Sequence, residues 1–320
     1  MTIIDVVDLK KYFTLSTPIL EMETGVVKAV NGISFHINHG ETLGLVGESG
    51  SGKTTTGKLI LRLLKPTAGK ILLEGRDISK ISDREFRAIR KDLQVVFQNP
   101  YASLDPKMTI QDILTQPLTI HKIVQPLEYS KEVVRLLNLV GLSKKDANRF
   151  PHEFSGGQRQ RIGIARAIST KPKFIVCDEP VSALDVSIQS QILNLMMDLQ
   201  REFKLSYLFI AHGLNVIKHV SNRVAVMYLG KIVEVGNAET IFNTPKHPYT
   251  KALISASPIP DPDIKRERII LKDEIPSPIN IPTGCTFHTR CAECMDICRS
   301  NEPELQGLDE HQIACHLVNF

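Results

Sequence analysis

The sequence lacks any stretch that approaches the roughly 18–20 consecutive apolar residues of a membrane-spanning helix. Its first residues, MTIIDVVDLKK, place no charged leader before an apolar run, so they do not predict a signal peptide. Strong basic clusters are also missing. The net charge is +4, and the densest run, Lys265, Arg266 and Arg268, is typical of a solvated linker rather than of a nucleic-acid-binding face. These absences predict a cytoplasmic protein that reaches a membrane only through a partner.

Cysteine is scarce along most of the chain and abundant at its end. Cys177 stands alone, whereas the other five of the six cysteines lie between residues 285 and 315. In a reducing compartment such a cluster favours a metal site over disulfides. The remaining composition, with 42% hydrophobic and 23% charged residues, is ordinary for a globular protein and argues against disorder.

Apolar runs alternate with helical patterns through residues 1–255. Four of these runs are typical of strands buried on both faces: ETLGLVG (41–47), LQVVFQ (93–98), KFIVCDE (173–179) and SYLFIAH (206–212). Because helical patterns such as 186–203 lie between them, the expected core is α/β with a mainly parallel sheet. More polar, alternating runs predict a smaller antiparallel sheet from residues 3–9, 27–37 and 70–73.

Two segments depart from this alternation. The helical pattern continues without a strand over about residues 99–168, which predicts a helical subdomain inserted into the α/β core. After residue 255, prolines interrupt regular structure and predict an extended linker over 256–283; they are Pro258, Pro260, Pro262, Pro276, Pro278 and Pro282. The cysteine cluster then predicts a small metal-stapled module over 284–320.

Residues 47–55, GESGSGKTT, match the phosphate-loop pattern G-x-x-x-x-G-K-[ST]. Its glycines, Gly47, Gly50 and Gly52, allow a tight turn whose backbone N–H groups point at phosphate oxygens, and the helix that follows adds the positive end of its dipole. Lys53 supplies a mobile charge for the β- and γ-phosphates, and Thr54 offers a hydroxyl to Mg²⁺. The apolar strand before the loop and the helical pattern after it favour this interpretation over a plain glycine-rich turn.

A phosphate loop needs a second acidic element to hold Mg²⁺, and FIVCDE supplies one at the end of an apolar run. Asp178, at the carboxyl end of a strand, can face the phosphate loop and hold the metal's water shell. Glu179 would then act on the in-line water as a base or an orienting group.

Together with further motifs, these elements make the chain resemble the ABC ATPase family over residues 1 to about 245. FSGGQRQR, at 154–161, resembles the family's signature motif, which contacts the γ-phosphate of ATP held by the partner subunit. Gln98 stands at the Q-loop position, which touches Mg²⁺ and the attacking water. Asp185, in SALD, matches the D-loop at the dimer seam, and His212 matches the switch histidine that contacts the γ-phosphate.

Two further positions follow from the resemblance. Tyr12 falls where the family stacks an aromatic ring on adenine, although Phe13 is adjacent and a core aromatic is the usual alternative. Gly213 replaces the aspartate that usually follows the histidine, which predicts a looser start to the next helix without loss of a catalytic group.

The resemblance implies a P-loop NTPase fold with an antiparallel β subdomain and a helical subdomain, and ATP and Mg²⁺ as cofactors. The implied catalytic residues are Gln98, Glu179 and His212. The implied Mg²⁺ ligands are Thr54, Gln98 and Asp178. The implied nucleotide-binding residues are Tyr12, Gly47, Ser49, Gly50, Ser51, Gly52, Lys53, Thr54, Thr55, Gln98, Ser155, Gly156, Gly157, Gln158, Asp178 and Asp185.

The tail narrows the resemblance to the ATPases of di- and oligopeptide importers, whose nickel-importer relatives share it. The matching segments are KHPYTKALISASP (246–258), GCTFHTRC (284–291), EPEL (302–305) and ACHL (314–317). In that subfamily, four cysteines at the positions of Cys285, Cys291, Cys298 and Cys315 are associated with a [4Fe–4S] cluster. Four thiolates suit either Fe–S or Zn²⁺, and the absence of paired C-x2-C knuckles in that set favours Fe–S.

Other residues leave alternatives open. Cys294 forms a second C-x2-C-x3-C run with Cys291 and Cys298, and histidines offer further possible ligands at His288, His311 and His316. Cys177 points into a strand core and is expected to be structural.

The leading function is therefore ATP hydrolysis coupled to uptake of di- or oligopeptides, or alternatively of nickel. The implied partners are two membrane permease subunits, a second ABC ATPase subunit that is a paralogue, and indirectly a solute-binding protein, with the chain on the cytoplasmic face of the membrane. A soluble ABC ATPase that acts on nucleic acid or ribosomes is the alternative, but the chain has one ATPase unit and no basic patch. A regulator without turnover is disfavoured by Glu179 and His212.

Overall fold

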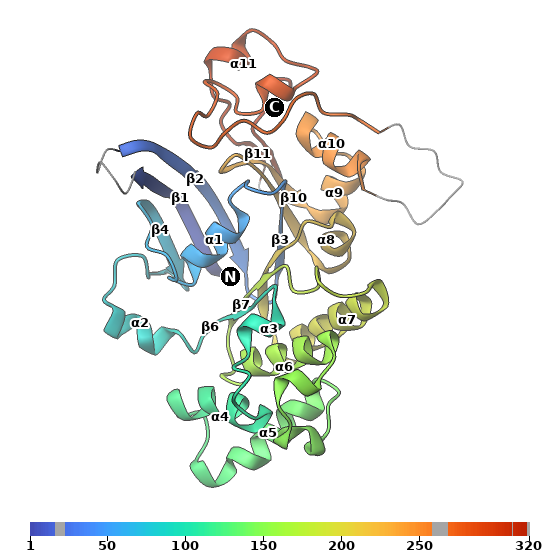
Figure 1. The fold of residues 1–320 in the computed structure, drawn as a ribbon. Helices are drawn as coiled ribbons and strands as arrows, with labels where there is room; N and C mark the ends of the chain where they lie inside the picture. The colour runs from blue at the N-terminus through green and yellow to red at the C-terminus, as the bar shows by residue number, and fades with distance from the viewer. Residues whose placement is uncertain (17–22, 258–267, 309, 319–320) are drawn as a thin grey trace. The chain divides into compact units, whose positions relative to one another are not determined.

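The computed structural model describes residues 1–16, 23–257, 268–308 and 310–318 (Figure 1). The chain divides into two compact units. Unit 1 holds Met1, residues 38–40 and residues 81–209, and unit 2 holds residues 2–37, 41–80 and 210–320. The phosphate loop therefore belongs to unit 2, whereas Asp178 and Glu179 belong to unit 1.

An antiparallel sheet lies in the N-terminal part of unit 2. Its strands follow the order β2 (Glu23–Asn38), β1 (Thr2–Ser16), β4 (Ala68–Leu73) and β5 (Arg76–Asp77). β1 pairs antiparallel with β4, with Ile4 opposite Leu73. Ile4 and Val6 are buried whereas Val7 is exposed, which is the period-two pattern of a half-buried strand. The predicted antiparallel arrangement of the early strands is confirmed for β1 and β4.

A mixed sheet of unit 2 leads into the phosphate loop. β3 (Thr42–Val46), buried along its whole length, runs parallel to β9 (Arg223–Tyr228). From β9 the sheet continues antiparallel through β10 (Lys231–Asn237), β12 (His311–Ile313) and β11 (Gln306–Leu308). The helices of this unit are α1 (Lys53–Ile60), α8 (Leu214–Val220), α9 (Ala238–Asn243), α10 (Pro248–Ser255) and α11 (Ile297–Ser300).

Unit 1 contains parallel strands and most of the longer helices. β6 (Leu93–Val96) runs parallel to β7 (Phe174–Asp178), and β8 (Ser206–Ile210) lies on the other side of β7. The apolar runs predicted as buried strands are confirmed here, each slightly shorter than its run. The helices are α2 (Asp83–Ile89), α3 (Pro100–Ser103), α4 (Ile110–Ile120), α5 (Tyr129–Leu139), α6 (Gly156–Ile168) and α7 (Val186–Phe203).

Residues 99–168, all of which are described, form helices α3 to α6 and short 3₁₀ turns, and they contain no strand. α4 begins at a capping box, which the side chains of Thr109 and Asp112 form. α4 buries Ile110, Ile113 and Leu114 at helical spacing, so it packs through one apolar face. This content agrees with the predicted helical subdomain, whose borders stay a prediction.

The segment that follows α10 is partly described. Residues 268–283 form neither helix nor strand, as expected for a proline-rich linker with Pro276, Pro278 and Pro282. The carbonyl oxygen of Pro278 accepts a hydrogen bond from the amide of Lys28 on β2 (3.2 Å). The remaining predicted linker residues, Pro258, Pro260, Pro262, Lys265 and Arg266, lie outside the described residues.

The cysteine-rich segment after residue 283 packs on the core of unit 2. β12 pairs with β10, with Ile313 opposite Glu234. Phe287 is 1% exposed, and its ring centroid lies 5.2 Å from that of Tyr228 and 5.3 Å from that of Tyr249. The predicted small metal-stapled module over 284–320 is therefore not confirmed, because strand pairing and aromatic burial against the core of unit 2 order the described part of this segment.

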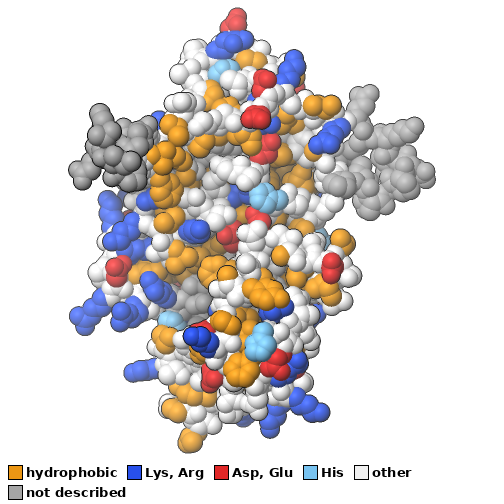
Figure 2. All heavy atoms as spheres, in the orientation of Figure 1, with side chains coloured by type: hydrophobic (Ala, Val, Ile, Leu, Met, Phe, Trp, Pro, Cys, Tyr) orange, Lys and Arg blue, Asp and Glu red, His pale blue; other side chains and the backbone are white. Residues whose placement is uncertain are grey.

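Two features of the described residues concern possible partners: the apolar content of the helices and the charged side chains of the surface. None of the helices in the described part of the chain combines the length and the apolar content that crossing a bilayer requires. On the face shown in Figure 2, Lys and Arg side chains lie at several separate places with Asp and Glu side chains among them.

Candidate nucleotide-binding site

The phosphate loop joins β3 to α1 and depends on three glycines with positive φ. The φ angle is +152° at Gly47, +80° at Gly50 and +105° at Gly52. A Cβ atom at Gly47 would lie 2.1 Å from the carbonyl oxygen of Met227, and one at Gly52 would lie 2.2 Å from that of Ala29. Side chains at these two positions would clash with backbone, whereas Gly50 faces open space and is required only for its φ.

Lys53, the first residue of α1, turns its side chain back into the loop. Its Nζ atom donates hydrogen bonds to oxygens of the loop itself: the carbonyls of Gly47 (2.7 Å) and Glu48 (2.9 Å) and the hydroxyl of Ser51 (3.2 Å). Lys53 is only 4% exposed. The loop therefore already contains, at its centre, the positive charge that phosphate binding requires.

Glu48 in this loop is held by residues that the sequence analysis missed. The hydroxyl of Tyr249 accepts a hydrogen bond from the Glu48 amide (2.8 Å). Arg290 binds the Glu48 carboxylate with two guanidinium nitrogens, at 2.7 and 3.2 Å. Because Tyr249 follows Glu48 by 201 residues and Arg290 follows it by 242, no local motif could have linked them.

His212 lies beside the phosphate loop. A cavity of about 240 Å³ in unit 2 is lined by Gly47 from the loop, by His212 and α8 residues, and by Ser257 after α10. Gly213 is the N-cap of α8 and provides no side-chain hydrogen bond there; the looser helix start expected from this glycine stays a prediction. The structure thus brings two of the predicted elements, the loop and the histidine, around one cavity.

Gln98 and Glu179 meet in unit 1. Gln98 follows β6 and Glu179 follows β7, and these strands are parallel neighbours, so their carboxyl ends lie at one edge. The Gln98 amide donates a hydrogen bond of 2.8 Å to the Glu179 carboxylate. Glu179 is 7% exposed and has a φ of +50°, a strained conformation for a residue with a side chain. Backbone strain of this kind concentrates at functional sites. The backbone carbonyl oxygen of Glu179 accepts a hydrogen bond from the hydroxyl of Ser182 (3.1 Å).

The signature motif opens α6 with a reciprocal cap. The Ser155 hydroxyl accepts a hydrogen bond from the Gln158 amide (3.3 Å), and the Gln158 side chain accepts one from the Ser155 amide (3.0 Å). A Cβ atom at Gly157 would lie 2.5 Å from a methyl group of Ile188, so this glycine lets α7 approach α6 closely. Ser155 itself is exposed at the positive end of the helix, where an anion would bind.

Two further residues predicted to bind nucleotide, Asp185 and Tyr12, are at least partly exposed. Asp185, the N-cap of α7, is exposed and makes no side-chain cap hydrogen bond. Tyr12 on β1 is half-buried and donates a hydrogen bond to the side-chain oxygen of Asn31 (2.6 Å). Its hydroxyl is thus anchored while the ring is partly accessible.

The tail cysteines are close to one another but are not arranged as a metal site. The amide of Cys285 donates to the carbonyl of Cys298 (2.9 Å). Burial raises the pKa of the Cys285 and Cys291 thiols to about 11, and neighbouring thiols add to the shift. Burial also raises the pKa of Cys315. Burial thus favours the neutral thiol form of these three cysteines.

No group of three or more His, Cys, Asp or Glu side chains within residues 1–16, 23–257, 268–308 and 310–318 is arranged to hold a metal ion. The histidines considered as ligands have other partners. His288 hydrogen-bonds with the carbonyl of Cys285, His311 with Glu234 and His316 with the carbonyl of Asn301. Cys177 is fully buried on β7, as predicted for a core residue.

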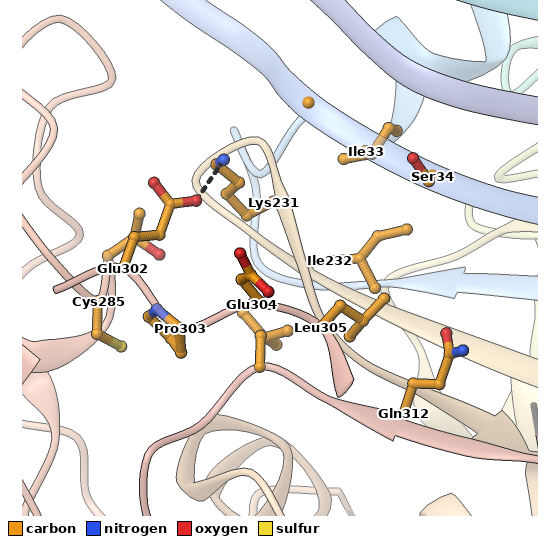
Figure 3. Close-up of a pocket in the computed structure, with 14 residues that line it drawn as sticks. Ile33, Ser34, Lys231, Ile232, Cys285, Glu302, Pro303, Glu304, Leu305 and Gln312 are labelled. Atoms are coloured by element: carbon orange, nitrogen blue, oxygen red, sulfur yellow. Dashed lines mark ion pairs between the residues drawn. The ribbon is translucent and has the colours of Figure 1, made fainter. Parts of the chain in front are cut away.

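A larger cavity of about 540 Å³ lies beside the tail (Figure 3). It is bordered by Ser34 of β2, by β10 and by the segment from Glu302 to Leu305. Lys231 and Glu302 point toward each other at this cavity and form an ion pair of 2.5 Å. Residues 47–55 of the phosphate loop are not among its lining residues.

Family comparisons agree with the geometry of both units. The ABC transporter family matches residues 30–182, and the family described as the oligopeptide/dipeptide transporter C-terminal region matches residues 233–298. The oligopeptide transport ATP-binding protein AppF of Bacillus subtilis is 51% identical, over 99% of this chain and 98% of its own. The putative oligopeptide transport ATP-binding protein YkfD of the same species is 52% identical, over 91% of this chain and 90% of its own.

Solved structures extend the match to the fold. The ATP-binding cassette MJ0796, in a dimeric post-hydrolysis state with ADP and phosphate, superposes with a TM-score of 0.65 at 27% identity, over 73% of this chain and 98% of its own. CbiO1 from Clostridium perfringens, part of an ABC transporter complex, superposes with a TM-score of 0.64 at 26% identity, over 76% of this chain and 91% of its own. This chain therefore belongs to the ATP-binding subunits of ABC transporters and is an ATPase whose C-terminal region is that of the oligopeptide/dipeptide transporter family.

Proposed function

We propose that this chain hydrolyses ATP to drive the uptake of oligopeptides or dipeptides through membrane permease subunits. The observation that carries the proposal is the near full-length similarity to relatives named for oligopeptide transport, in a chain that keeps an intact phosphate loop. The tail supports the same subfamily, since the oligopeptide/dipeptide transporter region matches residues 233–298.

In the proposed mechanism, the phosphate loop binds the triphosphate of ATP. Backbone N–H groups of Gly50, Gly52 and their neighbours Ser49, Ser51 and Thr55 surround the phosphates, and Lys53 moves from loop oxygens to phosphate oxygens. Thr54, Gln98 and Asp178 would hold Mg²⁺, and the ion would supply positive charge to neutralise the phosphates. Tyr12 stacks on the adenine ring.

Glu179 is proposed to act on the attacking water. A carboxylate that is fixed by the Gln98 amide at 2.8 Å keeps one orientation and can accept the proton of a water aligned with the γ-phosphate. His212 contacts the γ-phosphate from the side of the phosphate loop. The support for this role is that His212 shares a cavity with Gly47.

The remaining site residues are proposed to act on nucleotide held by a second ATPase subunit, a paralogue of this chain. Ser155, Gly156, Gly157 and Gln158 at the start of α6 offer N–H groups and a hydroxyl to the γ-phosphate of that ATP. Asp185 lies at the seam between the two subunits. ATP binding closes the pair, and hydrolysis reopens it.

The proposed assembly contains two membrane permease subunits, with a solute-binding protein that delivers substrate from outside. The chain would lie on the cytoplasmic face of the membrane, and the motion would reach the permease near Gln98 and the helical subdomain. The proposed domains are 1–255 for the ATPase, with the helical subdomain at about 99–168, then 256–283 for the linker and 284–320 for the tail.

A [4Fe–4S] cluster on Cys285, Cys291, Cys298 and Cys315 stays a proposal for the tail, with Zn²⁺ as its alternative. Its support is the resemblance and the adjacency of Cys285 and Cys298. In the described part of the chain these thiols do not form a metal-binding group.

Uptake measurements test the proposed function. A strain without this chain is expected to lose uptake of labelled di- or oligopeptides and to regain it with the wild-type chain. Loss of nickel uptake with unchanged peptide uptake would contradict the peptide assignment. Recovery of the chain with ribosomes instead of with membranes would favour the soluble ABC ATPase alternative.

A further inference from the structure

We infer that Arg290, in the C-terminal tail, is a positioning residue for ATP binding that acts through Glu48 of the phosphate loop. The inference rests on the proposed nucleotide site. It assigns to the tail a direct part in phosphate binding: Arg290 neutralises and holds an acidic side chain that would otherwise repel the phosphates.

The contact between the two residues is close and sheltered. The Arg290 guanidinium meets the Glu48 carboxylate with one nitrogen at 2.7 Å and another at 3.2 Å, a two-point geometry. The side chain of Arg290 is 6% exposed and that of Glu48 is 26% exposed, so solvent screens the pair poorly. A third nitrogen of Arg290 donates to the carbonyl of Lys272 (3.3 Å), which fixes the plane of the guanidinium.

An aromatic cluster fixes the segment that carries Arg290. The amide of Arg290 donates to the carbonyl of Phe287 (3.0 Å) in a 3₁₀ turn. The Phe287 ring packs against Tyr228 of β9 and Tyr249 of α10, whose centroids lie 4.7 Å apart. These three rings are each at most 1% exposed. The buried aromatic cluster of unit 2 therefore fixes the backbone that carries Arg290.

Glu48 connects this anchor to the groups that bind phosphate. Its carbonyl accepts hydrogen bonds from Lys53 Nζ (2.9 Å) and from the Ser51 amide (3.2 Å). Its amide donates to Tyr249 (2.8 Å), and its carboxylate binds Arg290. A shift of Glu48 would move the carbonyl that orients Lys53, and an unneutralised carboxylate would place a negative charge in a loop built for phosphates.

The charge argument makes the inference testable by rescue. In Arg290→Met the Glu48 carboxylate loses its counter-charge, and the Kd for ATP is expected to rise by about 3- to 10-fold, the effect of one poorly screened charge near a bound phosphate. Glu48→Gln in the same chain removes the repelling charge and is expected to return the Kd to within about twofold of wild type.

The experiment uses the full chain and measures ATP and ADP affinity by titration, with thermal unfolding to establish that each variant is folded. Arg299→Met, at an exposed arginine of the same segment, is the matched control and is expected to bind ATP normally. Arg290→Lys keeps the charge without the two-point geometry, and an intermediate Kd is expected. If Arg290→Met does not fold, the ATP Kd of Arg290→Lys tests the inference instead.

Two outcomes would overturn the inference. One is an unchanged ATP Kd in a folded Arg290→Met chain. The other is a Kd that Glu48→Gln fails to restore, since Arg290 would then act on something other than Glu48. Lys53→Ala separates these outcomes from failure of the nucleotide site itself. If Lys53→Ala also leaves the ATP Kd unchanged, the phosphate loop assignment is wrong; if it weakens binding while Arg290→Met does not, only the role of Arg290 is wrong.

Discussion

The side-chain amide of Gln98 donates a hydrogen bond of 2.8 Å to the carboxylate of Glu179. The two residues are 81 positions apart and meet because they follow the parallel neighbours β6 and β7. The bond orients a buried carboxylate that also has a left-handed backbone. Two residues predicted to be catalytic are thus in direct contact.

Glu179→Gln is expected to keep ATP binding and to lower turnover by about 10²- to 10⁴-fold, because the carboxamide cannot accept the proton of the attacking water. The variant should accumulate an ATP-bound dimer that does not reopen. Steady-state ATPase rates and gel filtration with ATP measure both effects. Glu202→Gln, at an exposed glutamate of α7, is the control. Turnover within a few-fold of wild type would remove Glu179 from its catalytic role.

Lys53→Ala is expected to weaken ATP binding as well as turnover. The side chain donates to three oxygens of the loop and carries the charge that would meet the phosphates, so its loss should raise the ATP Kd by about tenfold or more. Nucleotide titration checks this value. Lys58→Ala changes an exposed lysine of the same helix and should leave the Kd unchanged. An ATP Kd equal to that of wild type in the first variant would contradict the phosphate loop assignment.

Because of the buried side chain of His247, we expect the free energy of unfolding to fall in mild acid. Its Nδ1 atom accepts a hydrogen bond from the Tyr249 amide at the start of α10 (3.1 Å), and burial lowers its pKa to about 3. Since an unfolded histidine has a pKa near ~6.5, the unfolded chain binds more protons between these values, and stability falls with falling pH by about 1.4 kcal/mol per unit from this group. The loss begins as the pH drops below about 6.5.

The variant His247→Asn keeps a capping acceptor that does not titrate, so its urea midpoint should depend less on pH between about 6.5 and 4. His219→Asn, at an exposed histidine, is the comparison and should keep the wild-type slope. An unchanged slope in His247→Asn would show that other groups cause the acid sensitivity.

The cluster prediction for the tail is tested by anaerobic purification of the full chain. A [4Fe–4S] cluster would give a brown protein with about four irons per chain. Replacement of Cys285, Cys291, Cys298 or Cys315 by serine should bleach it, whereas Cys294→Ser should not, and basal ATP hydrolysis should largely survive. A colourless preparation with one zinc per chain would overturn the cluster, and bleaching by Cys294→Ser alone would show a different ligand set.

Local patterns carried much of the sequence prediction. The glycines of the phosphate loop were identifiable because their conformations and close approaches are required at fixed spacing. The strands that lead to Asp178 and into the loop are continuous apolar runs, so their positions were predicted within a few residues. The tail was less predictable: a short, proline-rich segment suggested a metal staple, whereas it is ordered on the core through Phe287 and β12.

The sequence by itself determined that the chain is an ABC-type ATPase, because each of its motifs is a short run in which neighbouring residues act together on phosphate or water. Only the tertiary structure decided which distant residues support those motifs. Arg290 is hydrogen-bonded to Glu48, which lies 242 positions away in the sequence, and Gln98 is hydrogen-bonded to Glu179, which lies 81 positions away. Such pairs leave no local pattern, because the packing of strands and aromatic rings, rather than sequence spacing, sets the distance between their side chains.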